Sequence, residues 1–226
     1  IQQKFNDWKL IIIDNCSTDN SKKIIQKYSK NEKISTFFLK KNMGVSFSRN
    51  LGMRLSDSKY ISFIDADDIW GNSKLINQIE FMEKNNYNFT YTDYTPFFDK
   101  KIRIFKKEII TPSSFNYEKF LYDSSIGTSS MILSRKIIGV IKFPKVKTLE
   151  DFSFKCKILK KKINAVKFNE NNTFYRITKN SLTSNKIKNL YWLWNINKKH
   201  NKLNIINNLK SLVLISFRSL KKYGFK

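Results

Sequence analysis

A chain of 226 residues with 41% hydrophobic and 15% aromatic residues can bury the core of one large domain, or of one domain with a helical appendage. Its two cysteines, Cys16 and Cys156, are too few for a disulfide framework, which favours a reducing, cytosolic setting. No secretory signal is visible at the start, and no apolar run approaches the ~18 residues that a bilayer span needs. We therefore expect a soluble or peripheral protein.

The net charge of +25 is compatible with three kinds of partner: nucleic acid, an anionic membrane face or an anionic small substrate. The lysines are spread over the whole length among many Asn and Ile residues, rather than gathered in one patch. The chain shows no zinc-ligand spacing, RNA-binding aromatic signature or helix-turn-helix pattern. Nucleic acid is therefore not expected as a partner, whereas the other two classes stay open.

The first half of the chain alternates predicted strands and helices. Apolar or β-branched runs indicate strands over 8–14, 34–40, 60–64 and 88–94. Apolar positions at helical spacing indicate helices over 22–29, within 42–54 and over 73–85. This order predicts an α/β, Rossmann-like fold, in which a mostly parallel sheet with right-handed crossovers is flanked by helices.

The second half is less regular. The pattern predicts a basic hairpin or an extended excursion over 97–110, helices over 115–122 and 148–159, and strands over 128–134, 163–169 and 172–177, with 136–141 ambiguous. A polar loop over 178–185 then leads out of the sheet. We accordingly predict a catalytic domain over 1–185 and a basic, helical C-terminal extension over 186–226.

The extension contains a predicted helix over 203–223 with an apolar stripe along one side. The stripe comprises Ile206, Leu209, Val213, Phe217 and Leu220. Basic residues flank it, namely Lys210, Arg218, Lys221 and Lys222. A basic amphipathic helix of this kind suits an anionic membrane surface, and it suits packing on the rest of the protein equally well.

Three carboxylates, Asp65, Asp67 and Asp68, follow the predicted strand over 60–64. In an open α/β sheet the carboxyl ends of the strands form the crevice where ligands bind. Carboxylates there suit a hard divalent cation, which in turn could hold the phosphates of a nucleotide. The alternative is a strand end followed by a helix that Asp68 caps.

Three further segments carry candidate residues, each with a structural alternative. The loop 14–19 is predicted as a strand-to-helix turn with Ser17 or Thr18 as the cap, and this does not exclude a ligand, because a helix start also presents free N–H groups to an anion. Arg49 is either a phosphate ligand or a solvated surface residue. Asp151 lies three residues after Thr148, which is a capping-box spacing.

Four of these elements share one layout: Ile-Asp-Asn-Cys-Ser-Thr-Asp at 13–19, the Gly44 and Gly52 segment at 42–52, the acidic 65–68, and Glu150 with Asp151. In this order and spacing, residues 4–185 resemble the family 2 glycosyltransferases. These GT-A-fold enzymes transfer a sugar from a nucleotide sugar with inversion.

The resemblance implies a role for each matching residue. The nucleotide-sugar donor would be bound by Asp14, Asn15, Ser17, Asp19, Arg49, Asp65 and Arg176. Mn²⁺ or Mg²⁺ would be held by Asp67 and Asp68, and Asp151 would be the catalytic base with Glu150 beside it. Many relatives carry a second Asp where this chain has Asn15, which leaves the choice of base open. The family's opening strand and first helix do not precede Ile1, so we expect an N-terminally truncated chain.

The predicted activity is a metal-dependent, inverting hexosyl or N-acetylhexosaminyl transfer. The expected donor is a UDP-sugar, and the expected acceptor is a growing surface glycan such as lipopolysaccharide or capsule, or a lipid-linked glycan. The expected location is cytoplasmic, including the inner face of the cell membrane.

Two other functions remain open. One is a catalytically inactive, basic module of the same fold that binds anionic glycan or nucleic acid. The four carboxylates Asp65, Asp67, Asp68 and Asp151 argue against it, because a binding module has no need of all of them. The other is a sugar nucleotidyltransferase, which needs a Gly-rich signature after its first strand.

Overall fold

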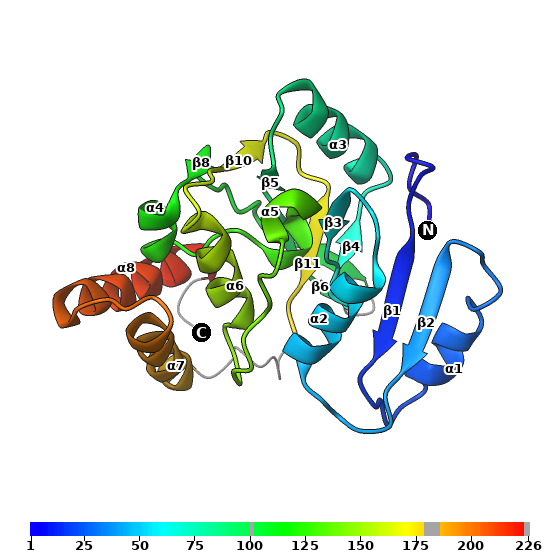
Figure 1. Ribbon diagram of the computed structural model, residues 1–226, viewed down its shortest axis with the longest axis horizontal. Coiled ribbons are helices and arrows are strands. Elements are labelled where there is room, and N and C mark those ends of the chain that lie inside the picture. The colour runs from blue at the N-terminus through cyan, green and yellow to red at the C-terminus, as the bar shows by residue number, and fades with distance from the viewer. Residues whose placement is uncertain (100–101, 179–185, 224–226) are drawn as a thin grey trace.

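The computed structural model describes residues 1–99, 102–178 and 186–223. The strands in chain order are β1 (Leu10–Asp14), β2 (Ile34–Phe38), β3 (Tyr60–Ser62), β4 (Ile69–Trp70), β5 (Phe89–Thr92), β6 (Thr95–Asp99), β7 (Arg103–Phe105), β8 (Ser114–Phe115), β9 (Ile132–Ser134), β10 (Ala165–Phe168) and β11 (Thr173–Arg176). The helices are α1 (Ser21–Gln26), α2 (Val45–Leu55), α3 (Lys74–Lys84), α4 (Tyr117–Leu121), the 3₁₀ turn η1 (Thr128–Ser130), α5 (Arg135–Ile138), α6 (Glu150–Leu159), α7 (Lys186–Lys199) and α8 (Ile205–Tyr223). The α/β class with flanking helices is therefore confirmed (Figure 1).

The strands form three sheets. β1 and β2 pair in parallel, a second sheet has the order β3-β9-β5-β10-β8, and a third has the order β4-β11-β6-β7. Among the described strands, three pairings are parallel and five are antiparallel, so the prediction of a mostly parallel sheet is wrong. The main reason is β9, which inserts between β3 and β5 and runs antiparallel to both.

Between residues 97 and 141 the structure differs in part from the predicted elements. The hairpin is confirmed as β6 paired with β7. The ambiguous segment 136–141 overlaps the short helix α5. The strand expected over 128–134 is half wrong, because its first part is the 3₁₀ turn η1 and only Ile132–Ser134 joins the sheet. Three polar residues at Thr128–Ser130 allow a turn there, and this turn brings hydroxyl groups toward the loop after β3.

An aromatic core lies between the five-stranded sheet and the helices α4 and α6. Phe143 stacks on Phe154 with ring centroids 3.9 Å apart, and Phe120 stacks on Phe152 at 5.5 Å. Phe120, Phe152 and Phe154 are buried, and each contributes roughly 1.5–3 kcal/mol by leaving water. Because Phe152 and Phe154 belong to α6, this packing fixes the helix whose first turn carries Glu150 and Asp151.

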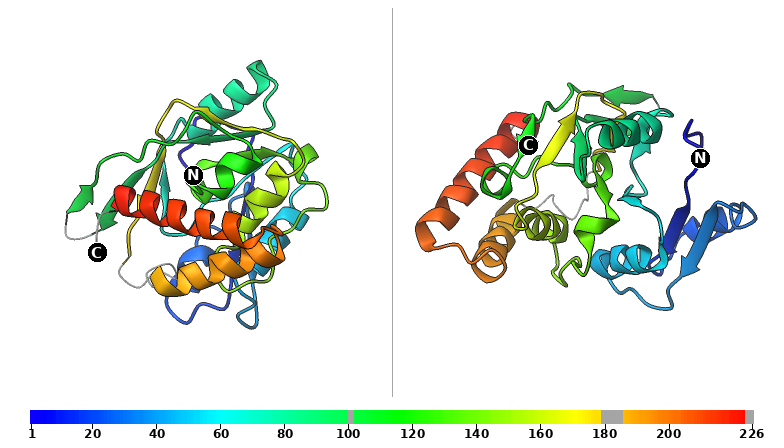
Figure 2. Two further views of the ribbon diagram at one scale, coloured as in Figure 1. Left: turned by 90° about the vertical axis from the view of Figure 1, so that its left-hand side faces the viewer. Right: turned by 45° about the horizontal axis from the view of Figure 1, so that its top comes forward.

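The helices α7 and α8 lie side by side at the end of the molecule away from β1 and β2 (Figures 1 and 2). Leu193 and Ile196 of α7 belong to the same core cluster as the α6 residues. The predicted division at residue 185 stays a prediction, because residues 179–185, which were predicted as a polar loop, lie outside the described part of the chain. No helix in that described part is long and apolar enough to cross a membrane.

Candidate functional site

The loop after β3 holds the predicted metal carboxylates. Its turn is closed by a hydrogen bond from the Asp68 backbone N–H to the Asp65 carbonyl, at 2.9 Å. The Asp68 carboxylate accepts from the Ser129 hydroxyl at 2.6 Å and from the Arg176 backbone N–H at 3.0 Å. The alternative of a helix cap is wrong, because the residues after Asp68 form the strand β4.

Burial sets the protonation of Asp68. It raises the pKa of this carboxyl to about 6, and the neighbouring charges of Asp65 and Asp67 act in the same direction. The hydrogen bonds from Ser129 and Arg176 oppose the rise without cancelling it. Asp68 therefore lies in a place that penalises its negative charge, as expected for a carboxylate that a cation or a proton must complete.

Asp67 differs from its two neighbours because its side chain is exposed. Its backbone carbonyl accepts from Arg176 Nε at 2.8 Å, which ties the loop to β11. Arg176 also forms an ion pair with Asp99 of β6. Within the described residues no side chain forms a hydrogen bond or ion pair with the Asp67 carboxylate, which leaves its oxygens open to an incoming ligand.

Arg49 joins the loop to α6. Its guanidinium donates to Asp65 Oδ1 at 2.6 Å and to Glu150 Oε1 at 2.7 Å, and it lies over the Phe143 ring at 5.4 Å. Burial alone would lower the pKa of Arg49, but the carboxylates Asp65, Asp151 and Glu150 together raise it. The alternative of a solvated surface arginine is wrong, because its side chain is only 12% exposed.

The first turn of α6 carries two carboxylates with opposite pKa shifts. Burial raises the pKa of Glu150, the charge of Asp151 adds to the rise, and Arg49 offsets part of it. Asp151 is also penalised by burial, but the ammonium group of Lys155 and then the Arg49 guanidinium hold its pKa well below its usual range. Asp151 is therefore ionised at any physiological pH.

Asp151 is held by two side chains that are not among the predicted site residues, Lys155 and Thr128. One carboxylate oxygen accepts from Lys155 Nζ at 2.7 Å and from the Thr128 hydroxyl at 3.0 Å. Lys155 is only 1% exposed and also donates to the Ile126 carbonyl at 2.7 Å, whereas the Asp151 side chain keeps 31% of its surface exposed. Lys155 and Thr128 thus hold the carboxylate through Oδ2, and part of the side chain stays accessible to an acceptor hydroxyl.

The capping-box alternative for Asp151 is not what the structure shows. The N-cap of α6 is Leu149, which has a left-handed backbone (φ 59°), and no side chain makes a capping hydrogen bond there. A signal for the actual partner was present in the sequence: Lys155 follows Asp151 by four residues on a helix.

The loops after β1 and β2 form a second cluster. Asn15 Nδ2 donates to Asn42 Oδ1 at 2.8 Å, and Asn15 Oδ1 accepts from the Met43 N–H at 2.8 Å, so this amide joins the two loops. The buried carboxylate of Asp14 accepts from the Ser17 N–H at 3.2 Å. Neither Ser17 nor Thr18 caps α1, because the helix begins at Ser21 after Asn20.

Asp19 closes this second cluster at the start of α1. It accepts from the Ser21 N–H at 2.9 Å, and the hydrogen bonds from Ser21 lower its pKa. Among the residues that the structure describes, no hydrogen bond or ion pair links this cluster to the carboxylates of the β3 loop and α6. The helix α2 connects the two groups, because it follows the Asn42 loop and carries Arg49.

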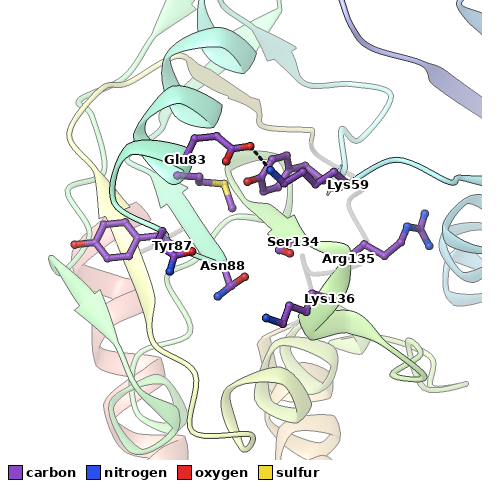
Figure 3. A pocket seen from close by; sticks show the side chains of 10 residues that line it. Lys59, Glu83, Tyr87, Asn88, Ser134, Arg135 and Lys136 are labelled. Carbon is purple, nitrogen blue, oxygen red and sulfur yellow. Dashed lines mark hydrogen bonds and ion pairs between the residues drawn. The ribbon is translucent and has the colours of Figure 1, made fainter.

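A hollow of about 530 Å³ lies at the opposite edge of the sheet. Figure 3 shows Lys59, Glu83, Asn88, Ser134 and Lys136 around it, at the beginning of β3 and β5 and the end of β9. None of the predicted site residues lines this hollow. The chemistry predicted from the sequence therefore belongs to the loops at the carboxyl ends of β3 and β1 and not to this hollow.

The carboxylates of the β3 loop suit a hard cation only in a site where the substrate and water supply most of the ligands. No group of three or more His, Cys, Asp or Glu side chains in the described ranges could by itself hold a metal ion. Mg²⁺ is commonly bound through one or two carboxylates, with phosphate oxygens and water completing the octahedron. The exposed Asp67 and the desolvated Asp68 fit that kind of site, in which the substrate supplies the remaining ligands.

Sequence comparison relates the chain to known proteins. Residues 1–143 match the model of glycosyl transferase family 2. TuaG of Bacillus subtilis, a glycosyltransferase named for teichuronic acid biosynthesis, is 30% identical over 223 residues, which cover 98% of this chain and 88% of that protein. WfaP of Escherichia coli, named UDP-Glc:alpha-D-GlcNAc-diphosphoundecaprenol beta-1,3-glucosyltransferase, is 32% identical over 192 residues, or 84% and 74% of the two chains.

Solved structures show the same fold. S. aureus TarS 1-349 in complex with UDP-GlcNAc superposes with a TM-score of 0.71 at 16% identity, covering 97% of this chain and 66% of that one. The mannosyltransferase PcManGT of Pyrobaculum calidifontis, in complex with GDP-Man and Mn²⁺, gives 0.66 at 11% identity, covering 100% and 70%. Likeness at these identities concerns the GT-A fold alone. With the family match over residues 1–143, it follows that this chain belongs to glycosyl transferase family 2.

Proposed function

We propose that this protein moves a sugar from a UDP-sugar to a hydroxyl of a lipid-linked surface glycan, with inversion, at the inner face of the cell membrane. The observation that carries the proposal is Asp151, an ionised carboxylate that is fixed by Lys155 and Thr128 and keeps an open front. The relatives support the substrate classes: WfaP is named for a UDP-Glc donor and a diphosphoundecaprenol-linked acceptor, and TarS was solved with UDP-GlcNAc.

Asp151 acts as the general base in this proposal. As the acceptor oxygen attacks the anomeric carbon, its proton passes to an Asp151 carboxylate oxygen and the new C–O bond forms. The bond from the anomeric carbon to the diphosphate breaks in the same step, and its electron pair leaves with the nucleoside diphosphate. One displacement at one carbon inverts its configuration.

The loop after β3 serves the leaving group. Asp67 and Asp68 are the residues that would hold Mn²⁺ or Mg²⁺, and the bound ion would supply positive charge that stabilises the departing diphosphate. Asp65 does not face the ligand directly in this proposal, because Arg49 already holds it at 2.6 Å. Arg176 contributes by fixing the loop from β11, through Asp68 and the Asp67 carbonyl.

Arg49 and Glu150 form a clamp between the two catalytic elements. Arg49 has five N–H donors, and Asp65 and Glu150 take two of them, so others stay available to a donor phosphate. The second cluster, with Asp14, Asn15, Ser17 and Asp19, would bind the nucleoside. Asn15 already uses Oδ1 and one amide hydrogen within the protein, which leaves one hydrogen for the base.

The test is a screen of UDP-Glc, UDP-GlcNAc and GDP-Man for hydrolysis, with Mn²⁺, Mg²⁺ or EDTA. We expect turnover of a UDP-sugar, its loss in EDTA, and its recovery when the metal is restored. Turnover that is unchanged by EDTA would contradict the metal site. Absence of turnover of every nucleotide sugar, together with tight nucleic-acid binding, would favour an inactive basic module instead.

A further inference from the structure

Helix α8 carries an apolar surface on its outer side. Five large apolar side chains are between 51% and 77% exposed there: Ile205, Ile206, Leu209, Val213 and Phe217. From Ile206 onward they follow one another at three or four residues, which places them along one side of the helix, and Ile205 lies four residues before Leu209. We call this set the α8 stripe. Figure 2 shows α8 at the outer edge of the molecule, with α7 beside it.

The inner side of α8 is more polar than the outer side. Asn208 and Ser211 are buried, and Leu212 and Ile215 pack partly against the core. Asn208 Nδ2 donates to the Trp194 carbonyl at 3.1 Å, and the Ser211 hydroxyl donates to the Leu121 carbonyl at 2.6 Å. Rolling the helix to bury the stripe would break these buried hydrogen bonds, so the protein holds the stripe outward.

The charge around the stripe has one sign. Residues 186–223 contain nine Lys and Arg residues and neither Asp nor Glu. Exposed cations on α8 itself are Lys210, Arg218 and Lys221. Arg218 forms an ion pair with the buried Asp123 at 2.6 Å, which fixes one of these cations beside Phe217. An apolar stripe between cations matches the interface of an anionic bilayer, where acyl chains lie next to phosphate groups.

We propose that α8 is a docking surface for an anionic phospholipid bilayer, with the stripe in the headgroup region and the flanking cations on lipid phosphates. The helix spans 19 residues, and its buried polar side excludes a transmembrane orientation. It therefore lies along the membrane surface. The inference adds a membrane contact to the proposed function and does not depend on sugar-transfer chemistry.

Vesicle flotation of the full chain tests the proposal directly. The vesicles contain phosphatidylcholine alone or with phosphatidylglycerol, and the test variant is Val213→Glu with Phe217→Glu. The matched control is Val140→Glu with Ile110→Glu, because these apolar residues are 91% and 64% exposed and lie outside α8. We expect the wild type and the control to float with anionic vesicles, and the α8 variant to bind at least about tenfold more weakly.

The flotation result is interpreted together with light scattering, circular dichroism and donor hydrolysis. Binding by the α8 variant equal to that of the wild type would overturn the proposal, as would a wild type that floats with neither vesicle. Light scattering tests a second copy as the occupant: a wild-type dimer that the α8 variant converts to monomers, with vesicle binding unchanged, also overturns it. Circular dichroism and donor hydrolysis in solution should match the wild type, which separates this result from any failure of the proposed chemistry.

Discussion

The loop after β3 and the first turn of α6 shift the pKa of an aspartate carboxyl group in opposite directions. Burial raises the pKa of Asp68 to about 6, and the nearby groups that bond to it are a hydroxyl and a backbone N–H. Burial acts on Asp151 too, but a buried lysine reverses the effect and lowers the pKa. The difference shows that burial raises the pKa of a carboxyl whose partners are neutral, as at Asp68, and that a bonded cation outweighs burial, as at Asp151. Asp68 thus carries a negative charge with no cationic side chain bonded to it in the described residues, whereas Asp151 is paired with Lys155.

Removing the charge of Asp151 gives the largest expected effect. Asp151→Asn keeps the shape but loses the base, so turnover should fall by about 10²–10⁴-fold while the donor dissociation constant changes little. Steady-state kinetics and calorimetric titration of the donor measure the two quantities. Asp57→Asn is the control, because Asp57 is 82% exposed and, within the described residues, its one ion pair is with Lys9. Near-normal turnover of Asp151→Asn would remove the base assignment.

Lys155→Met tests whether the lysine is the cause of the low pKa of Asp151. Without its cation, Asp151 has a higher pKa, so the acid limb of the pH profile of kcat/KM should move to higher pH. The folded pKa of Asp151 lies below the unfolded one, so the pair stabilises the protein fully above about pH 4 and less as the pH falls. We expect a loss of about 2 kcal/mol at pH 7 in urea unfolding, which shrinks below pH 4.

Lys157→Met controls for the loss of a lysine from the same helix, because Lys157 Nζ donates to the Lys142 carbonyl and not to Asp151. An unmoved acid limb in Lys155→Met, with normal folding, would show that Lys155 does not set the charge state of Asp151.

Ser129→Ala tests the support of Asp68. The serine hydroxyl orients the Asp68 carboxylate at 2.6 Å, and loss of a group that orients a metal ligand typically weakens metal affinity by 10–100-fold. The Mn²⁺ concentration for half-maximal hydrolysis should therefore rise by about that factor, with kcat at saturating metal nearly restored. Ser113→Ala, at an exposed position, is the control. An unchanged metal requirement would separate Asp68 from the metal site.

Asp68→Asn gives the smallest expected change in the free energy of unfolding. The change is a gain in stability, whereas Lys155→Met loses stability. The folded pKa of about 6 lies above the unfolded value, so the ionised carboxyl destabilises the fold above pH 6 and not below about pH 4. The amide removes this cost. Thermal unfolding should show a gain of about 1–2 kcal/mol at pH 7.5 and none at pH 4. A loss of stability at pH 7.5 would contradict the idea that Asp68 lacks a built-in cation.

The sequence predicted the elements that local pattern determines. Most of the strands and helices, and the carboxylates after Tyr60–Ser62, were predicted from periodicity and turn residues, whereas α5 fell in the ambiguous segment 136–141 and β4 was not predicted. The insertion of β9 between β3 and β5 was not, because that pairing joins segments about 70 residues apart and leaves no periodic signal.

The support of the site was harder to predict than its carboxylates. Lysines are usually exposed, so nothing in the pattern of α6 marked Lys155 as buried, and its second partner is the Ile126 carbonyl of a distant loop. The stripe of α8 was visible, but its direction was not. Asn208 and Ser211 are polar, and only their partners in α7 and α4 explain why they face inward.

The most direct test of the account is the configuration of the sugar first released to water from an α-linked UDP-sugar, followed by NMR before the anomers interconvert. A single displacement with Asp151 as the base predicts that the β anomer is released first, and that its release is slowed in Asp151→Asn. Release of the α anomer first would require two displacements, or attack on the anomeric carbon from the same side as the leaving diphosphate. Either result would contradict the role given to Asp151.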